Sequence, residues 1–282
     1  MKKLKYILPI LFVITLFTSC SSDDDDPVII NETEGLTKVQ EFTNATHTIE
    51  VYTKTGKFYS GYNDISLRIK NNTDDTYFEN YTINWMPIMQ MPSMSHSCPK
   101  SGISKVENMD TLYQGYLVFQ MTNEDESGWS IKFMYNIDDT DYMAESNIAV
   151  KQTARQNVTT FMGSDETRYI ISLVEPMNPE IAINNMKATL HKMETMMSFP
   201  VVEDYTITLD PRMPSMGNHT SPNNTDLTFN TSENKYNGDL SLTMTGYWVL
   251  NLKLLNQNNE VLKGETITED TIQSTLYLEI EF

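Results

Sequence analysis

The sequence predicts an all-β protein made of two tandem immunoglobulin-like β-sandwich domains. Three observations predict this fold: short segments that alternate apolar and polar residues, the lack of any long helical period, and an internal duplication with a spacing of about 123 residues. Each copy is about 110 residues long with roughly seven strands, which is typical of an immunoglobulin-like sandwich.

The alternating segments are rich in β-branched and aromatic residues and are separated by Asn, Asp, Gly and Pro, which are strand and turn signals. They lie at 46–53, 65–69, 117–121 and 129–133 in the first copy, and at 170–174, 240–244 and 248–254 in the second. A sandwich buries one face of each strand, so we expect Trp129 and Trp248 to lie in the two cores.

The duplication is visible as a series of matched residues in the same order. The pairs are Tyr81 and Tyr205, Pro87 and Pro211, Met91 and Met213, Met94 and Met216, His96 and His219, Pro99 and Pro222, Tyr113 and Tyr236, Met121 and Met244, and Trp129 and Trp248. A nearly constant offset is what a tandem duplication leaves. We therefore predict one domain over 45–163 and a second over 164–282, with the boundary near Gly163.

Residues 1–19 are predicted to be a secretory signal peptide. Three lysines, at positions 2, 3 and 5, precede an apolar run at 6–17 and the sequence Thr18-Ser19-Cys20. The run is shorter than the roughly 20 apolar residues that a membrane-spanning helix needs. Its end resembles a bacterial lipobox, which implies lipid modification of Cys20 and a membrane anchor. The alternative is an ordinary secretory signal with an incidental cysteine.

Residues 20–44 are predicted to form the lipid anchor and an acidic tether. Four adjacent aspartates, Asp23 to Asp26, repel one another and stay solvated. An acidic stretch directly after the lipid-modified cysteine resembles the surface-export signal of Bacteroidetes lipoproteins. We therefore expect an outer membrane lipoprotein, either at the cell surface or, if the stretch is a plain spacer, at the periplasmic face.

The composition excludes some classes of partner. Loss of the leader removes three of the 20 basic residues and leaves 17 against 38 acidic ones, a net charge of −21. Nucleic-acid binding requires basic patches, so no nucleic-acid partner is predicted. With Cys20 acylated, Cys98 has no partner for a disulfide within the chain. No nucleophile–base pair recurs in the two copies, so an enzyme is not predicted.

One loop in each copy combines methionine, proline and histidine. The first contains Met91-Pro-Ser-Met94 followed by His96, and the second contains Met213-Pro-Ser-Met216 followed by His219. Proline after the first methionine favours a turn, which brings residues i and i+3 within about 7 Å at their Cα atoms. Two sulfurs can then face one point, and the histidine can close a third side. The sequence therefore predicts a metal site in each loop.

Two thioethers and an imidazole are soft ligands, which favour Cu(I). Calcium and magnesium prefer oxygen ligands, and zinc prefers cysteine, histidine or carboxylate. In the first copy Met86, Met89 and Cys98 are further candidate ligands, and Trp85 can face a bound cuprous ion through its ring. Cys98 has no counterpart in the second copy and is otherwise an incidental thiol.

A structural interpretation of the loops competes with metal binding. Methionine fills irregular gaps in cores, and the chain has 18 of them, so the loops can simply plug the ends of the sandwiches. Against this, two of the four histidines directly follow the two Met-Pro-Ser-Met segments. We expect packing roles for Met121, Met186, Met193, Met196, Met197 and Met244.

The loop, a following Tyr-x-Gly and an apolar strand that ends in Met, Gly and Trp form a longer pattern. Its residues are Met91, Met94, His96, Pro99, Tyr113, Gly115, Met121, Gly128 and Trp129 in the first copy, and Met213, Met216, His219, Pro222, Tyr236, Gly238, Met244, Gly246 and Trp248 in the second. The pattern resembles the YtkA-like or FixH-like domain. The resemblance implies a small extracytoplasmic β-sandwich, often found with copper or cytochrome-oxidase assembly proteins. The spacing from Met94 to His96 and an insertion before Trp129 set the first copy apart from the second.

These features predict an extracytoplasmic lipoprotein that binds Cu(I) for sequestration or relay, with a copper-handling protein as its partner. The alternative is a non-metal interaction module of two immunoglobulin-like domains at the cell surface, which binds protein or glycan. An aromatic groove bearing exposed Tyr113 or Tyr236 would favour that alternative.

Overall fold

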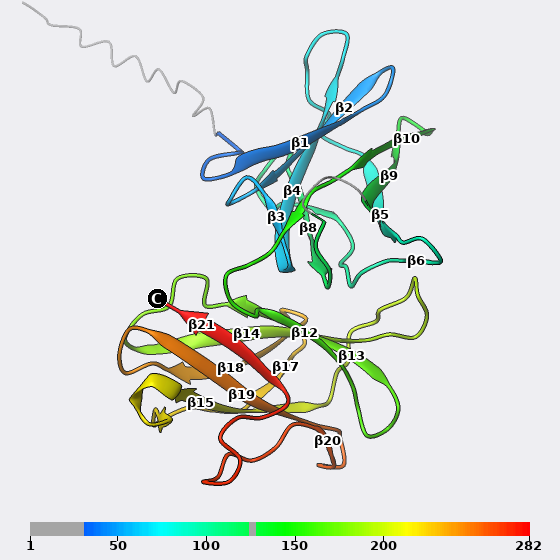
Figure 1. The fold of residues 1–282 in the computed structure, drawn as a ribbon. Coiled ribbons are helices and arrows are strands. Elements are labelled where there is room, and N and C mark those ends of the chain that lie inside the picture. Colours follow the sequence, from blue (N-terminus) through cyan, green and yellow to red (C-terminus); the bar gives the residue numbers. More distant parts are fainter. Residues whose placement is uncertain (1–30, 124–127) are drawn as a thin grey trace, which may run out of the picture. The chain divides into compact units, whose positions relative to one another are not determined.

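The computed structural model describes residues 31–123 and 128–282, and residues 32–282 form one compact unit (Figure 1). The described residues are all β apart from one turn of 3-10 helix, η1 (Pro214–Met216). The predicted signal peptide, Cys20 and the four aspartates lie outside the described residues. No helix in the described ranges is long and apolar enough to cross a bilayer.

Strands before residue 152 form three sheets. The first sheet has the strand order β1 (Thr37–Thr43), β2 (His47–Thr53), β4 (Gly61–Asn71), β8 (Tyr113–Phe119), β7 (Ser104–Lys105). The second sheet has the strand order β10 (Thr140–Asn147), β9 (Trp129–Ile137), β5 (Thr82–Gln90), β6 (Ser95–His96). In the third sheet, β11 (Val150–Lys151) pairs in parallel with β3 (Phe58–Tyr59). The first two sheets are antiparallel. Because β1 pairs with β2, residues 37–43, which were expected in the tether, belong to the fold.

Strands after residue 157 form one antiparallel sheet of ten strands. Eight of its strands follow one another in the order β12 (Val158–Met162), β13 (Arg168–Glu175), β14 (Ile183–Lys192), β18 (Lys235–Ser241), β17 (Leu227–Asn230), β15 (Thr206–Met213), β19 (Tyr247–Leu255), β20 (Val261–Lys263). The other two strands are β16 (His219–Thr220), which pairs with β15, and β21 (Tyr277–Glu281), which pairs with β19. The short strand β17 pairs with both β18 and β15 and so joins two groups of strands.

The two halves of the chain share one strand order. The series β1-β2-β4-β8-β7 corresponds to β12-β13-β14-β18-β17, and β10-β9-β5-β6 corresponds to β21-β19-β15-β16. This correspondence agrees with the duplication seen in the sequence. The sheets change between Lys151 and Val158, a few residues before the boundary predicted near Gly163. The division into two domains itself stays a prediction.

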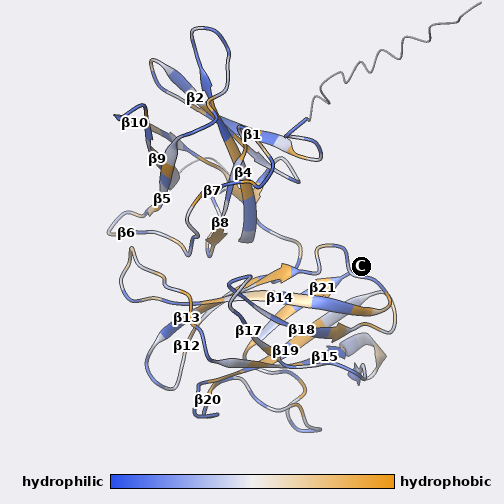
Figure 2. Ribbon diagram, turned by 180° about the vertical axis from the view of Figure 1, so that it is seen from behind, coloured by the Kyte–Doolittle hydropathy of each residue, from blue (hydrophilic) through white to orange (hydrophobic). Residues whose placement is uncertain are grey.

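Each half has its own apolar core, and Trp129 and Trp248 are fully buried in them, as the alternation predicted. Figure 2 shows apolar residues along strands such as β19. Both indoles use their Nε1–H in the same way, on the carbonyls of Met121 and Met244 at 3.0 and 3.1 Å. Satisfying this polar group lets a tryptophan be buried without an unpaired donor.

A charged cluster stabilises the first sheet. Glu50, only 4% exposed on β2, accepts hydrogen bonds from Tyr52, Lys38, Tyr77 and Arg68 at 2.6 to 3.0 Å. The Arg68 guanidinium also lies over the Tyr77 ring at 3.8 Å. Burial alone raises the pKa of Glu50, but these four donors outweigh it and lower that pKa to about 2.

We predict that Glu50→Gln removes a defined part of the pH dependence of stability. A folded-state pKa of about 2 against an ordinary value of 4.5 gives stability that is complete above pH 4.5 and lost as the pH falls toward 2. The shift corresponds to a contribution on the order of 3 kcal/mol. Urea unfolding between pH 2 and 7 measures it. Wild type should lose more stability than Glu50→Gln over that pH window. The control is Glu41→Gln, at a 47% exposed side chain that also pairs with Lys38, and it should follow wild type. Parallel curves for wild type and Glu50→Gln would contradict the assignment.

Candidate metal-binding site

The first Met–His loop is the hairpin between β5 and β6. Along β5, Trp85, Pro87 and Met89 point into the core while Met86 faces outward, as strand alternation requires. Beyond β5 the chain reverses, and the Met91 N–H donates to the Met94 carbonyl at 2.9 Å. The predicted bend at the Pro-Ser pair is therefore present. Met91 stays partly buried against the core of the first half, whereas Met94 is 45% exposed.

His96 follows directly on β6, opposite Met89. Its Nδ1 lies 2.7 Å from the Ser97 carbonyl. A carbonyl oxygen only accepts, so Nδ1 carries the hydrogen and Nε2 of the neutral ring carries the free lone pair. The ring also packs edge-on against Trp129, at 5.5 Å between centroids. An imidazole oriented by a hydrogen bond from its other nitrogen is the usual state of a metal ligand.

Met91, Met94 and His96 line one open cavity of about 480 Å³. The other residues around it are Gln120, Met121, Thr160, Arg168, Ile170, Met193, Met196 and Phe199. Five of the eleven lining residues are thus methionines. We call this cavity the methionine pocket. Within the described residues, no group of three or more His, Cys, Asp or Glu side chains is placed to hold a metal, so a site here relies on thioethers and one imidazole.

The permanent charge around the pocket comes from one arginine among the described lining residues. Arg168 is the one permanently charged residue among the described lining residues, and its side chain is exposed. In water a repulsion between unit charges at about 4 Å amounts to only about 1 kcal/mol. The net charge of −18 over the whole chain attracts cations at longer range. This background attracts any cation, and the preference for a singly charged soft ion comes from the neutral thioether donors.

The second Met–His loop does not assemble a corresponding set. Met213 is 2% exposed and belongs to the core of the second half, while Met216 is 55% exposed on η1 and His219 is exposed on β16. With one thioether in the core and two donors facing solvent, these three residues do not fit as ligands of one ion. The prediction of equivalent sites in both copies is not supported by this geometry.

The strand register explains the difference between the loops. Met213 pairs with His219 as Met89 pairs with His96, and Pro211 pairs with Leu250 as Pro87 pairs with Ile131. The structural counterpart of Met213 is therefore Met89, and the sequence match of Met213 with Met91 was wrong by two residues.

Both buried methionines pack under a glycine with a positive φ. A Cβ added to Gly128 would lie 2.9 Å from the Met89 sulfur, and one added to Gly246 would lie 3.3 Å from Met213 Cε. The two glycines have φ values of +93° and +126°. This shared packing shows that the Met89 and Met213 positions are structural in both halves.

The further candidate ligands of the first copy lie elsewhere. Met86 is 39% exposed on the outer face of β5, and Met89 is in the core. Trp85 is fully buried, with its Nε1–H donated to the Ser101 carbonyl at 2.9 Å, so its ring cannot face an ion in the pocket. Cys98 is 1% exposed in the same core, and this burial raises the pKa of its thiol, which disfavours the thiolate that a metal needs.

Three lining methionines were expected to be packing residues. Met121 is 41% exposed and Met196 is 44% exposed, and Met193 is half-buried. Met121 has a visible sequence signal, since it belongs to the duplicated pattern, but Met193 and Met196 have none. Met186 fully matches the expectation, because it is buried in the core of the second half.

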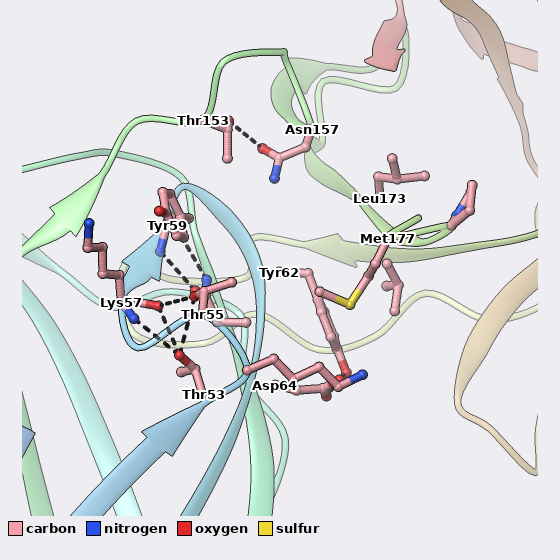
Figure 3. A pocket seen from close by; sticks show the side chains of 14 residues that line it. Thr53, Thr55, Lys57, Tyr59, Tyr62, Asp64, Thr153, Asn157, Leu173 and Met177 are labelled. Atoms are coloured by element: carbon pink, nitrogen blue, oxygen red, sulfur yellow. Dashed lines mark hydrogen bonds between the residues drawn. The ribbon is translucent and has the colours of Figure 1, made fainter. Parts of the chain in front are cut away.

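A second cavity of about 230 Å³ is lined mainly by residues with polar side chains (Figure 3). Its polar groups largely bond to one another: the Tyr62 hydroxyl donates to Asp64, Asn63 bonds to the backbone of Tyr59, and Thr153 donates to Asn157. The figure shows the Tyr62 hydroxyl directed toward Asp64. Few of these groups remain to recognise a ligand.

The tyrosines expected in an aromatic groove are buried instead. Tyr236 is inaccessible and Tyr113 is 6% exposed, stacked on Tyr81 at 4.0 Å between ring centroids. The groove that would favour a glycan-binding module is therefore not formed by these residues.

A comparison of the chain with models of protein families gave no match, and a comparison with curated proteins gave none either. The resemblance to YtkA-like or FixH-like domains thus rests on the motif residues alone.

We predict that Cys98 is inert in the folded chain. Because the thiol is buried and its pKa is raised, an excess of a chromogenic thiol reagent at pH 8 should not modify it within an hour, and urea should release one additional reactive thiol. The Cys98→Ser variant supplies the baseline in both conditions. Rapid labelling of Cys98 in the native protein would show that it is accessible and would restore it as a candidate ligand.

Proposed function

We propose that this chain is an extracytoplasmic lipoprotein that binds Cu(I) through Met91, Met94 and His96, for sequestration or relay. In this proposal Cys20 carries the lipid that anchors it to the outer membrane, and a copper-handling protein is its partner. The two halves, with their shared strand order, are proposed to be tandem immunoglobulin-like sandwiches of YtkA-like type.

The observation that carries the proposal is the composition of the methionine pocket. Thioethers and an imidazole with a free Nε2 lone pair converge on one cavity that is open to solvent. Core packing does not require exposed methionines, and Met94 is 45% exposed. Soft neutral donors of this kind match Cu(I) better than any hard cation.

A second candidate function is an interaction surface without a metal. The exposed Met94, Met121, Met196 and Met197 favour it, because methionines adapt to varied apolar partners. Leucine separates the two functions, since Met→Leu keeps volume and apolar character but removes the sulfur donor. Metal binding should be lost in leucine variants, whereas an apolar contact surface should persist.

We predict that the chain binds a single Cu(I) ion and that Met91→Leu/Met94→Leu/His96→Phe weakens its affinity at least about tenfold, or about 1.4 kcal/mol. Phenylalanine keeps a ring against Trp129 and removes the nitrogen donor. Anaerobic competition with a chromophoric Cu(I) chelator measures affinity and stoichiometry.

The matched control carries the corresponding changes in the second half, Met216→Leu/His219→Phe. Both side chains are exposed there, so the control should keep the affinity and stoichiometry of wild type. Two bound ions in wild type and one in the control would restore the two-site scheme. Equal Cu(I) binding by wild type and the first-half variant would end the proposal.

A further inference from the structure

Five of the six thioether and imidazole donors that line the methionine pocket come from two segments that are about 100 residues apart. Met91, Met94 and His96 stand on the β5–β6 hairpin, while Met193 and Met196 stand on the connection between β14 and β15. The two segments are in direct contact, because the Ser97 N–H donates to the Met196 carbonyl at 2.8 Å. His96 is the neighbour of Ser97, so this hydrogen bond brings the backbone that carries the imidazole next to the backbone that carries Met196.

The connection after β14 is a tight turn rather than a loose loop. The Glu194 N–H donates to the Ser198 carbonyl at 3.0 Å, and the Met197 N–H donates to the Thr195 hydroxyl at 3.2 Å. The Met193 N–H donates to the Arg168 carbonyl at 2.8 Å, which ties the turn to β13. The turn therefore presents Met193 and Met196 to the pocket from a supported backbone. Met197, the next residue, is 46% exposed and does not line the pocket.

The apolar contact behind the pocket is small. It consists of the buried Tyr116, Val118 and Ile170, with Tyr62, Val158, Met193 and Phe199 packed against them, and it has fewer residues than the core of either half. The halves also meet where Lys235 lies over the Tyr62 and Tyr116 rings and where the Tyr116 hydroxyl lies 3.3 Å from His191 Nε2. Any ligand held by both sides of the pocket would add to these contacts between the halves.

We propose that the soft-metal site is composite, with Met193 and Met196 coordinating the same Cu(I) ion as Met91, Met94 and His96, so that the ion joins the two halves of the chain. The inference rests on the proposed function, because it assigns further ligands to that site. With Met121 the pocket has five thioethers, more than one cuprous ion needs, so the pocket can exchange one sulfur for another without releasing the ion. By linkage, the ion strengthens the contact between the halves by the same factor by which that contact strengthens ion binding.

The test compares Met193→Leu/Met196→Leu with Met197→Leu in the full chain. Leucine preserves the apolar packing of Met193 next to Ile170 and removes only the sulfur. We expect the double variant to weaken Cu(I) affinity at least about tenfold in anaerobic chelator competition, and Met197→Leu to keep wild-type affinity. Met196→Leu alone, at a 44% exposed position with no packing to lose, should weaken binding in the same direction even if the double variant is unstable.

Hydrogen exchange gives a second readout that does not depend on affinity. Cu(I) should slow exchange of the Ser97 amide and of residues 193–199 in wild type, and this protection should be absent from the double variant. If both leucine variants keep wild-type affinity and protection is confined to residues 91–97, the composite site is wrong while Cu(I) binding by the first-half ligands stands. If wild type binds no Cu(I), the proposed function fails, and the composite site fails with it.

Discussion

The alternation of side chains along β5 decides which methionines can reach a ligand. A strand sends successive side chains to opposite faces, so Met89 must enter the core once Trp85 and Pro87 have done so. The hairpin that follows breaks this alternation and places Met91 and Met94 at the pocket. Every functional property proposed for the chain depends on the chain turning at this point, because one more residue of regular strand would change which sulfurs face the pocket.

The same constraint explains why duplication of the fold need not duplicate the site. On β15, Ile207, Leu209, Pro211 and Met213 face the core in the same register as their counterparts on β5. In the first half, residues 90–95 connect Met89 to its paired residue His96. In the second half, residues 214–218 connect Met213 to His219, which is one residue shorter, and part of this segment forms η1. Packing of the buried methionine and tryptophan is thus shared, whereas the loop that carries the soft donors differs. A fold repeat preserves its core more readily than its loop chemistry.

Much of the fold could be predicted from the sequence because strand alternation and internal repetition are local or periodic signals. From these signals we predicted that Trp129 and Trp248 lie in the two cores. The sequence match of Met213 with Met91 was wrong because it relied on the identical Met-Pro-Ser-Met segments. The true counterpart of Met213 is Met89, and only the pairing of the strands shows this. Met193 and Met196 could not be found at all, since their relation to His96 is a contact between distant segments that leaves no spacing pattern in the chain.

The position of the pocket gives its chemistry a mechanical consequence. Each half has its own core, and a smaller apolar cluster around Tyr116 and Ile170 contains residues from both halves. The hydrogen bond from Ser97 to Met196 places the soft donors at that junction rather than inside either core. Neutral thioethers bind without deprotonation, so these donors need not lose a proton to hold an ion. In the proposed composite site, a soft ion would therefore contact both halves of the chain at once.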